Sequence, residues 1–544
     1  MARENGSELD EVKKVFEVAT VDASDSFVSD TPEVSDDQTG TEAPYHVFTI
    51  RKKWQVVFIV SLAGLFFSLS SNIYFPALPA IAAAIDTDIS LVSFTVTIYM
   101  IFQGLAPSLW GPLSDMRGRR MTFICTFVVY LLANIGLAFS KDLASLMVFR
   151  ALQAIGTAAT ISVGAGVIGD ITTVKERGGF LGIFGGLRML GQSVGPVIGG
   201  FITEYRGFHG IFWFLVILVS LTLTLTLIVV FLPETLRSIA GNGTVRLTGI
   251  HRPLILRSLS RDWHDNPASH QSTPRSKFAV RCLLVPFVFL AEKDVACTLL
   301  FGAIVYTVWS MIASSTAALF HTRFGLSNFE TGLIFLPNGV ACILGTMATG
   351  AILNRDYRLT ESSYLAAQQL PPGTKLDHSR KHLADFPVSR ARLRSSWFLV
   401  PVFVISVAGY SFTVDSPRLV ALRKPGVAPA LALQALIAFT STAIYTQNSA
   451  LMVDLYPGAS ASATAVNNLA RCLIGAAGVA AVQFIVNEVG EGPAFVGFAG
   501  VVVLFCPLLA AEWLWRERWR RERLARLEGK QAAEGGEKAN KEDV

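Results

Sequence analysis

Long apolar stretches alternate with short polar ones along most of this chain. Each apolar stretch holds about 20 residues, which is the length that a helix needs to cross the hydrocarbon core of a bilayer. Twelve of them are found, at about 54–74, 92–112, 119–139, 143–168, 179–202 and 210–232, then at about 295–320, 329–353, 396–414, 427–449, 460–486 and 493–515. The pattern predicts an all-α membrane protein built from two six-helix bundles.

Polar segments divide the chain into five predicted parts. Residues 1–50 are rich in Asp and Glu and hold too little apolar sequence to fold alone, so we expect a disordered acidic tail in the cytosol. The other parts are an N-terminal six-helix bundle at 51–232, a cytosolic linker at 233–292, a C-terminal six-helix bundle at 293–515 and a basic cytosolic tail at 516–544.

The composition excludes an ordinary soluble protein. Hydrophobic residues make up 51% and charged residues 16% of the 544 residues, and the mean hydropathy is +0.47. A soluble domain carries about 25% charged residues. The histidines are scattered and the cysteines lack paired spacing, so we expect no metal site, no catalytic cluster and no enzymatic activity.

The basic residues predict the orientation of the chain in the membrane. Loops on the cytosolic side of a membrane protein carry an excess of Lys and Arg. Clusters of this kind occur at Arg51–Lys53, at Arg117–Arg120 and along Arg516–Lys530. All three fall on one side of the predicted spans, so both termini are expected in the cytosol.

The loop after the second span reads GPLSDMRGRRMTF and combines one carboxylate with three guanidiniums on predicted tight turns. Its candidate residues are Gly111, Asp115, Arg117, Gly118, Arg119 and Arg120. Opposite charges at a membrane edge suit a conformational latch between the two bundles, and Asp115 is the only acid in the string. The equivalent loop of the second half reads GAILNRDYR, with Asn354 at the acidic position, which indicates an internal repeat with a weaker latch.

The fourth span contains a charged residue, Arg150, followed by Gln153. An arginine inside a span is costly unless it is paired or faces water, so it is a candidate functional residue. The alternative is an arginine whose side chain reaches the outer interface.

The fifth span ends in a run of small residues and a proline, Gly191, Gly195, Pro196, Gly199 and Gly200. Glycines at such spacing allow helices to approach closely, and the proline loosens the helical hydrogen bonds. Close packing without a directional role is the alternative.

Alignment of the fifth span with the eleventh places Arg188 on Arg471. Both lie about 15 Å from the start of their helices at 1.5 Å per residue, so both should face one central cavity. Gln192, Asn467 and Asn468 are expected at the same cavity, where the two arginines would bind an anionic group of the substrate. The alternative is a packing role in which the guanidiniums bond to carbonyls or to the two asparagines.

These motifs together resemble the major facilitator superfamily. The loop after the second span is similar to the signature G-x-L-x-D-R-x-G-R-R, with Met116 where that family has arginine, and the fifth span is similar to the antiporter signature G-x-x-x-G-P-x-x-G-G. LPETLR at Leu232–Arg237 and LMVDLYPGASASATAVNNLARCLIGA at Leu451–Ala476 resemble the quinidine-resistance branch of the twelve-span fungal drug:proton antiporter family. The resemblance covers roughly residues 50 to 515.

The resemblance implies a fold with pseudo-twofold symmetry and a proton-coupled efflux antiporter that works by alternating access. Its cargo would be drugs, organic acids or a secondary metabolite, and Arg150 and Gln153 would serve proton coupling. We expect a functional monomer in the plasma membrane, or alternatively the vacuolar membrane, with the bilayer and a small-molecule substrate as partners, no nucleic acid and no cofactor. The proton gradient would be the energy source. A proton-coupled importer of a nutrient is the alternative, and the glycine–proline ending of the fifth span favours export.

Overall fold

The computed structural model describes residues 48–172, 174–217, 232–240, 292–368, 387–422, 424–455 and 460–542. These residues form helices and connecting turns, without a strand among them, so the all-α prediction is confirmed. The first half contains α2 (Ile50–Asn72), η1 (Phe75–Ala77), α3 (Leu78–Ile85), α4 (Ile89–Arg117), α5 (Arg119–Phe139), α6 (Leu143–Ile171), α7 (Val174–Leu215) and α9 (Arg237–Ala240).

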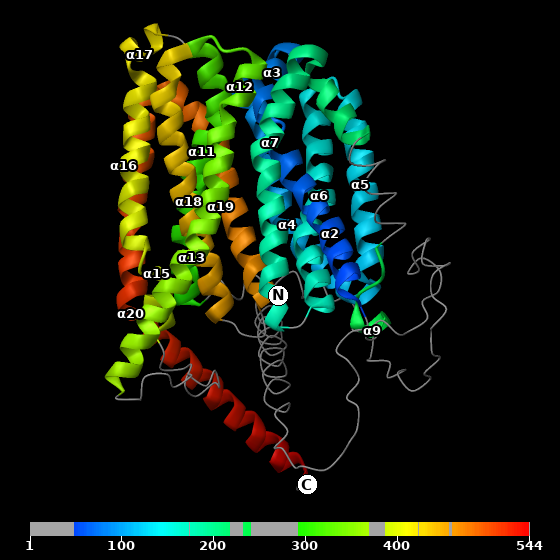
Figure 1. The fold of residues 1–544 in the computed structure, drawn as a ribbon, viewed down its shortest axis with the longest axis vertical. Helices are drawn as coiled ribbons and strands as arrows, with labels where there is room; N and C mark the ends of the chain where they lie inside the picture. The colour runs from blue at the N-terminus through cyan, green and yellow to red at the C-terminus, as the bar shows by residue number, and fades with distance from the viewer. Residues whose placement is uncertain are drawn as a thin grey trace, which may run out of the picture.

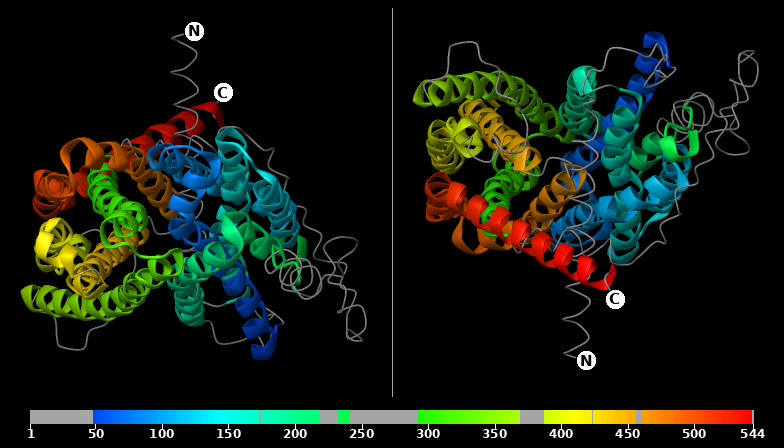
Figure 2. Two further views of the ribbon diagram at one scale, coloured as in Figure 1. Left: turned by 90° about the horizontal axis from the view of Figure 1, so that it is seen from above. Right: turned by 90° about the horizontal axis from the view of Figure 1, so that it is seen from below.

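The second half contains a similar set of helices and stands beside the first half in Figure 1. Its elements are α11 (Lys293–Phe324), α12 (Asn328–Leu333), α13 (Phe335–Ala367), α15 (Val388–Leu393), α16 (Ser396–Asp415), α17 (Pro417–Ala421), η7 (Lys424–Val427), α18 (Ala428–Leu455), α19 (Ser460–Val489) and α20 (Glu491–Glu542). The last part of α20 leaves the bundle and runs beneath it (Figures 1 and 2).

Ten helical segments of the described chain are long and apolar enough to cross a membrane. They match ten of the twelve predicted spans. The other two, at 179–202 and 210–232, both fall on α7, which bends at Gly207, where φ is 69°. Part of the second stretch, 218–231, lies outside the described residues, as do most of the predicted linker and the acidic tail, so the five-part division of the chain stays a prediction.

Each half buries its own apolar cluster. In the first half the cluster centres on fully buried side chains such as Val57, Tyr130 and Val163, and in the second half on side chains such as Phe320 and Phe403. The first cluster also includes Ala476 and Val479 of α19, so the two halves share apolar contacts at their boundary.

Close contacts join the two halves from the middle of the helices to one end. We call this end, where α3 meets the start of α4, the upper end, and the end where α4 finishes at Arg117 the lower end (Figure 1). The ring centroids of Phe201 and Phe329 are 5.9 Å apart across the upper end, and those of Phe94 and Phe484 are 6.1 Å apart. The structure is therefore in a state closed at its upper end.

Candidate functional site

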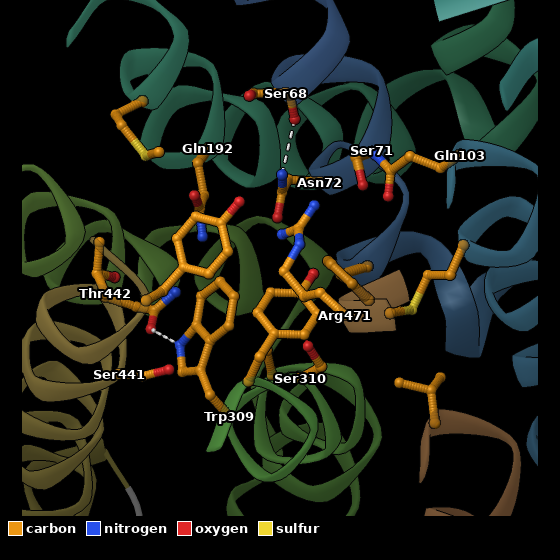
Figure 3. Close-up of a pocket in the computed structure, with 18 of the residues that line it drawn as sticks. Ser68, Ser71, Asn72, Gln103, Gln192, Trp309, Ser310, Ser441, Thr442 and Arg471 are labelled. Carbon is orange, nitrogen blue, oxygen red and sulfur yellow. Dashed lines mark hydrogen bonds between the residues drawn. The ribbon is translucent and has the colours of Figure 1, made fainter. Parts of the chain in front are cut away.

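A cavity lies between the two halves, below the closed upper end. Its empty volume is about 1010 Å³, counting the part open to solvent. Polar lining residues of the first half are Ser68, Ser71, Asn72, Gln103, Arg188 and Gln192, and those of the second half include Tyr306, Trp309, Asn338, Tyr445 and Arg471. Figure 3 shows Arg471 in the middle of the cavity, with Ser441, Thr442 and Trp309 along one side.

The charged side chains that line the cavity are both cationic. They are Arg188 and Arg471, and the described lining residues contain no Asp, Glu, Lys or His. Arg188 comes from α7 of the first half and Arg471 from α19 of the second half, so both positive charges face one cavity. At an effective dielectric constant near 20, a charge interacts about fourfold more strongly than in water. The cavity is therefore built to attract an anion.

Aromatic rings and an amide hold Arg471 in position on α19. Its guanidinium carbon lies 4.4 Å from the ring centroid of Tyr306 and 5.2 Å from that of Tyr445. Its Nη2 donates to Oδ1 of Asn468 at 2.7 Å. Two cation–π contacts and a short hydrogen bond fix the direction of the guanidinium before cargo arrives.

The uncharged polar groups of the cavity are partly committed to neighbours. Gln192 donates to Sγ of Cys342 in the other half at 3.7 Å, and Asn72 donates to the carbonyl of Ser68 at 2.7 Å. Trp309 donates to Oδ1 of Asn338 at 3.1 Å (Figure 3). The asparagine oxygens and amides that are not used in these bonds can orient a polar ligand.

The structure places three of the five predicted cavity residues on the cavity lining, namely Arg188, Gln192 and Arg471. Asn467 instead donates to Ser449 within the second half at 2.9 Å, and Asn468 accepts a hydrogen bond from Arg471. Neither asparagine lines the cavity, because both point from α19 toward neighbouring helices.

Sequence reasoning missed the aromatic residues Tyr306, Trp309 and Tyr445. In an apolar span, aromatic side chains at helical spacing resemble core residues, so the sequence carried no signal for them.

Arg150 is buried at 1% exposure beside the cavity but does not line it. Its guanidinium carbon lies 4.1 Å from the ring centroid of Tyr74 and 4.2 Å from that of Tyr99. Its Nη1 donates to Gln153 Oε1 at 2.5 Å, and Gln153 donates to Asn134 at 2.8 Å. The guanidinium therefore stays inside the first half, not at the outer interface.

The predicted latch residues form an ion cluster at the lower end of the first half. Nη1 of Arg119 lies 2.6 Å from Oδ1 of Asp115, and its Nε lies 3.1 Å from Oδ2 of Asp170 on α6. The side chain of Asp115 is 62% exposed and that of Asp170 only 16%. Arg117 is exposed. The sequence suggested that Asp115 is the only acid of the cluster, but Asp170 is a second one.

Glu234 is a further acid that the sequence did not reveal, and it caps the N-terminus of α5. Its carboxylate accepts from the backbone N–H of Arg119 at 2.8 Å and of Arg120 at 3.3 Å, and Arg120 donates to the carbonyl of Leu232. Gly118, with φ of 101°, makes room, because a β-carbon there would collide with Glu234. Anions are favourable at a helix N-terminus.

Two features of the latch prediction need correction. Gly111 lies inside α4 and makes no turn, because the helix continues to Arg117 before Gly118 ends it. In the second half Asn354 is exposed, and the buried acid is Asp356, which accepts from the hydroxyl of Ser395. The second copy therefore retains a carboxylate, two residues after the expected position.

The glycines of the antiporter motif pack against two different partners. Added β-carbons at Gly191 and Gly199 would collide with backbone carbonyls of Leu65 and Ile73, and one at Gly195 would lie 3.1 Å from the carbonyl of Leu69. These three glycines therefore fit α7 closely against the chain at α2.

The end of the same motif faces the second half. A β-carbon at Gly200 would collide with the carbonyl of Asn328, and one at Gly332 would lie 2.6 Å from the carbonyl of Pro196. The motif therefore contributes both to the core of the first half and to the closed upper end.

The sequence of this chain matches known transporters over nearly its full length. Residues 60–367 match the model of the Major Facilitator Superfamily. The chain is 49% identical over 509 residues to "Citrate exporter 1" of Aspergillus niger, which covers 94% of each protein. It is 30% identical over 467 residues to "MFS antiporter QDR2" of Candida albicans, which covers 85% of this chain and 89% of that protein.

A second drug-resistance protein is similar in sequence to this chain, and a solved structure is similar in fold. "Quinidine resistance protein 1" of Saccharomyces cerevisiae is 30% identical over 471 residues, covering 83% of this chain and 81% of that protein. The crystal structure of the human organic anion transporter MFSD10 (TETRAN) matches the fold with a TM-score of 0.52 at 16% identity, covering 84% of this chain and 99% of that one. The predicted resemblance is confirmed: the chain belongs to the Major Facilitator Superfamily of membrane transporters.

Proposed function

We propose that this efflux transporter exports small organic anions that carry carboxylates, by alternating access between its two halves. The observation that carries the proposal is the cavity, in which Arg188 and Arg471 are the charged lining residues. The relative with 49% identity along nearly the whole chain is a citrate exporter, and citrate is such an anion. Import is not favoured, because the named relatives are an exporter and drug-resistance antiporters.

Cargo would enter the cavity from the lower end, since the upper end is closed in this state. Its carboxylates would bind the guanidiniums of Arg188 and Arg471, one from each half. Closure of the lower end would then bring the exposed carboxylate of Asp115 toward the second half, and separation of α7 from α12 would release cargo at the upper end. Binding energy from both halves makes the occupied transporter able to change state.

The proton gradient is proposed as the energy source, with Arg150 and Gln153 as the coupling residues. In this scheme Arg150 contacts Tyr74 and Tyr99, whose chain neighbours Phe75 and Met100 line the cavity, so a protonation change would reach the cargo site through the helices without a carboxylate in it. The membrane potential acts in the same direction, because an anion that leaves a negative interior gains about 2.3 kcal/mol per charge per 100 mV.

We further propose a monomer in the plasma membrane with its lower end and both termini in the cytosol. In intact cells a membrane-impermeant thiol reagent should then label Thr87→Cys and spare Gly535→Cys. Labelling of Gly535→Cys from outside would overturn this orientation.

The substitutions Arg188→Gln and Arg471→Gln test the function. Each keeps a polar side chain of similar length and removes one charge, so export of citrate should fall at least tenfold while export of a cationic dye should not. Surface expression is measured in parallel. Equal loss of both cargoes would indicate a packing role for the arginines. Robust export of the dye by the unmodified protein, with no citrate export, would instead support the drug-efflux activity of the 30% identical relatives.

A further inference from the structure

A proline inside α4 leaves one backbone carbonyl without its helical partner. Pro107 has no N–H, so it cannot donate to the carbonyl of Gln103, four residues earlier. Gln103 lies about midway along α4 and lines the cavity. A buried carbonyl of this kind requires another donor.

Asn468 of the other half supplies that donor. Its Nδ2 donates to the carbonyl of Gln103 at 3.3 Å, and the residue is buried at 9% exposure. The backbones approach closely here, because a β-carbon on Gly104 would lie 2.8 Å from Cβ of Cys472. The bond therefore joins α4 to α19 across the boundary between the halves.

The same amide also holds the cargo arginine. Oδ1 of Asn468 accepts from Nη2 of Arg471 at 2.7 Å while Nδ2 binds Gln103. An asparagine amide has one acceptor and two donors, so a single side chain can serve both partners. Arg471 is thereby tied, through one residue, to a backbone atom of the opposite half.

We propose that Asn468 is a positioning residue that aligns Arg471 for cargo only while α4 and α19 are in the arrangement seen here. This inference rests on the proposed function, since it takes Arg471 as a cargo-binding group. At 3.3 Å the Asn468–Gln103 bond already exceeds the usual range of about 2.7–3.2 Å, so tilting α4 against α19 breaks it.

The consequence is an affinity switch. In the state closed at the upper end, Asn468 is fixed at both ends and Arg471 points into the cavity. When the upper end opens, Asn468 loses the Gln103 carbonyl and Arg471 loses its fixed direction, so cargo is held less tightly on the side where it must leave. A ligand that binds the two states unequally shifts their balance in this way.

The test compares the half-saturating citrate concentration with the maximal rate, in proteoliposomes loaded so that citrate enters from the lower end. Asn468→Ala should raise the half-saturating concentration about tenfold, equivalent to about 1.4 kcal/mol, with the maximal rate changed less than twofold. Asn467→Ala is the matched control and should change neither, because its amide binds Ser449 within the second half. If Asn468→Ala gives poor protein yield, Asn468→Ser carries the same expectation.

A double-mutant cycle with Pro107→Ala separates the tie from simple packing. Alanine restores an N–H at position 107, so the Gln103 carbonyl regains its helical donor, which competes with Asn468 for this carbonyl and weakens their bond. Pro107→Ala should therefore raise the half-saturating concentration severalfold, and adding Asn468→Ala should raise it no further than Asn468→Ala alone. Pro112→Ala, the other proline of α4, should leave it unchanged.

Additive effects in the cycle, or an Asn468→Ala variant that behaves like Asn467→Ala, would overturn the inference. Failure of the proposed function looks different, because Arg471→Gln would then leave citrate transport intact. Loss of maximal rate without a change in the half-saturating concentration would show that Asn468 acts on packing and not on the direction of Arg471.

Discussion

A methyl group added at Gly200 tests whether contact between α7 and α12 keeps the upper end closed. Its β-carbon would collide with the carbonyl of Asn328 and lie 3.0 Å from Cα of Gly332, both backbone atoms of the other half. Backbone cannot rotate away as a flexible side chain can, so the halves must separate locally. Overpacking of this kind costs about 1–3 kcal/mol, which lowers the ratio of closed to open states about 5- to 150-fold.

The assay measures how fast a cavity residue reacts with a thiol reagent from the upper side. Ser71 lines the cavity, so the rate at which a membrane-impermeant maleimide labels Ser71→Cys in intact cells reports opening of the upper end. Adding Gly200→Ala should speed this labelling at least fivefold. A Gly200→Ala variant that retains Ser71 measures the background labelling of the native cysteines.

The matched control is Gly182→Ala on the same helix, where an added β-carbon meets no heavy atom within 4 Å. It should label at the unmodified rate. The contact at Gly200 does not keep the upper end closed if Gly200→Ala reaches the surface normally and labels no faster, or if Gly182→Ala speeds labelling as much.

Two predictions concern the ion cluster at the lower end. Asp115→Asn should leave the melting temperature in detergent unchanged, because an exposed ion pair contributes about 0–1 kcal/mol. The same substitution should abolish citrate efflux. Asp170→Asn, which changes a more buried carboxylate, should lower the melting temperature. Normal efflux by Asp115→Asn would remove its role as a latch. Glu234→Ala should lower the melting temperature more than Glu234→Gln, because each buried N–H left without an acceptor costs about 1–3 kcal/mol, and equal melting temperatures would contradict that role.

The helices were predictable because hydropathy alone requires them. Lipid offers no hydrogen bonds, so an apolar stretch of sufficient length must form a helix. The bend of α7 at Gly207 was not predictable, since Gly207 stands among other glycines that stay helical, such as Gly199 and Gly210. Local sequence could not show which of them leaves the helical region.

The candidate site was predictable where a residue conflicted with its surroundings. A guanidinium inside an apolar span is costly, and alignment of the fifth span with the eleventh placed Arg188 and Arg471 at equivalent positions. Residues that suit their surroundings gave no such signal. Tyr306 resembled a core residue of its span, and Asp170, near the end of a span, resembled an ordinary residue of the membrane interface. The neighbourhood of Asn468 was predictable, but the direction of its side chain was not.

The carboxylate of Glu234 also determines how the protein could be divided into two chains. Although the residue comes after the last predicted span of the first half, it is 1% exposed and bound to the start of α5. A gene split directly after Leu232 would give this residue to the wrong polypeptide and leave α5 uncapped in the other. A split placed after Ala240 keeps the cap with its helix, so co-expressed fragments should be designed with that junction.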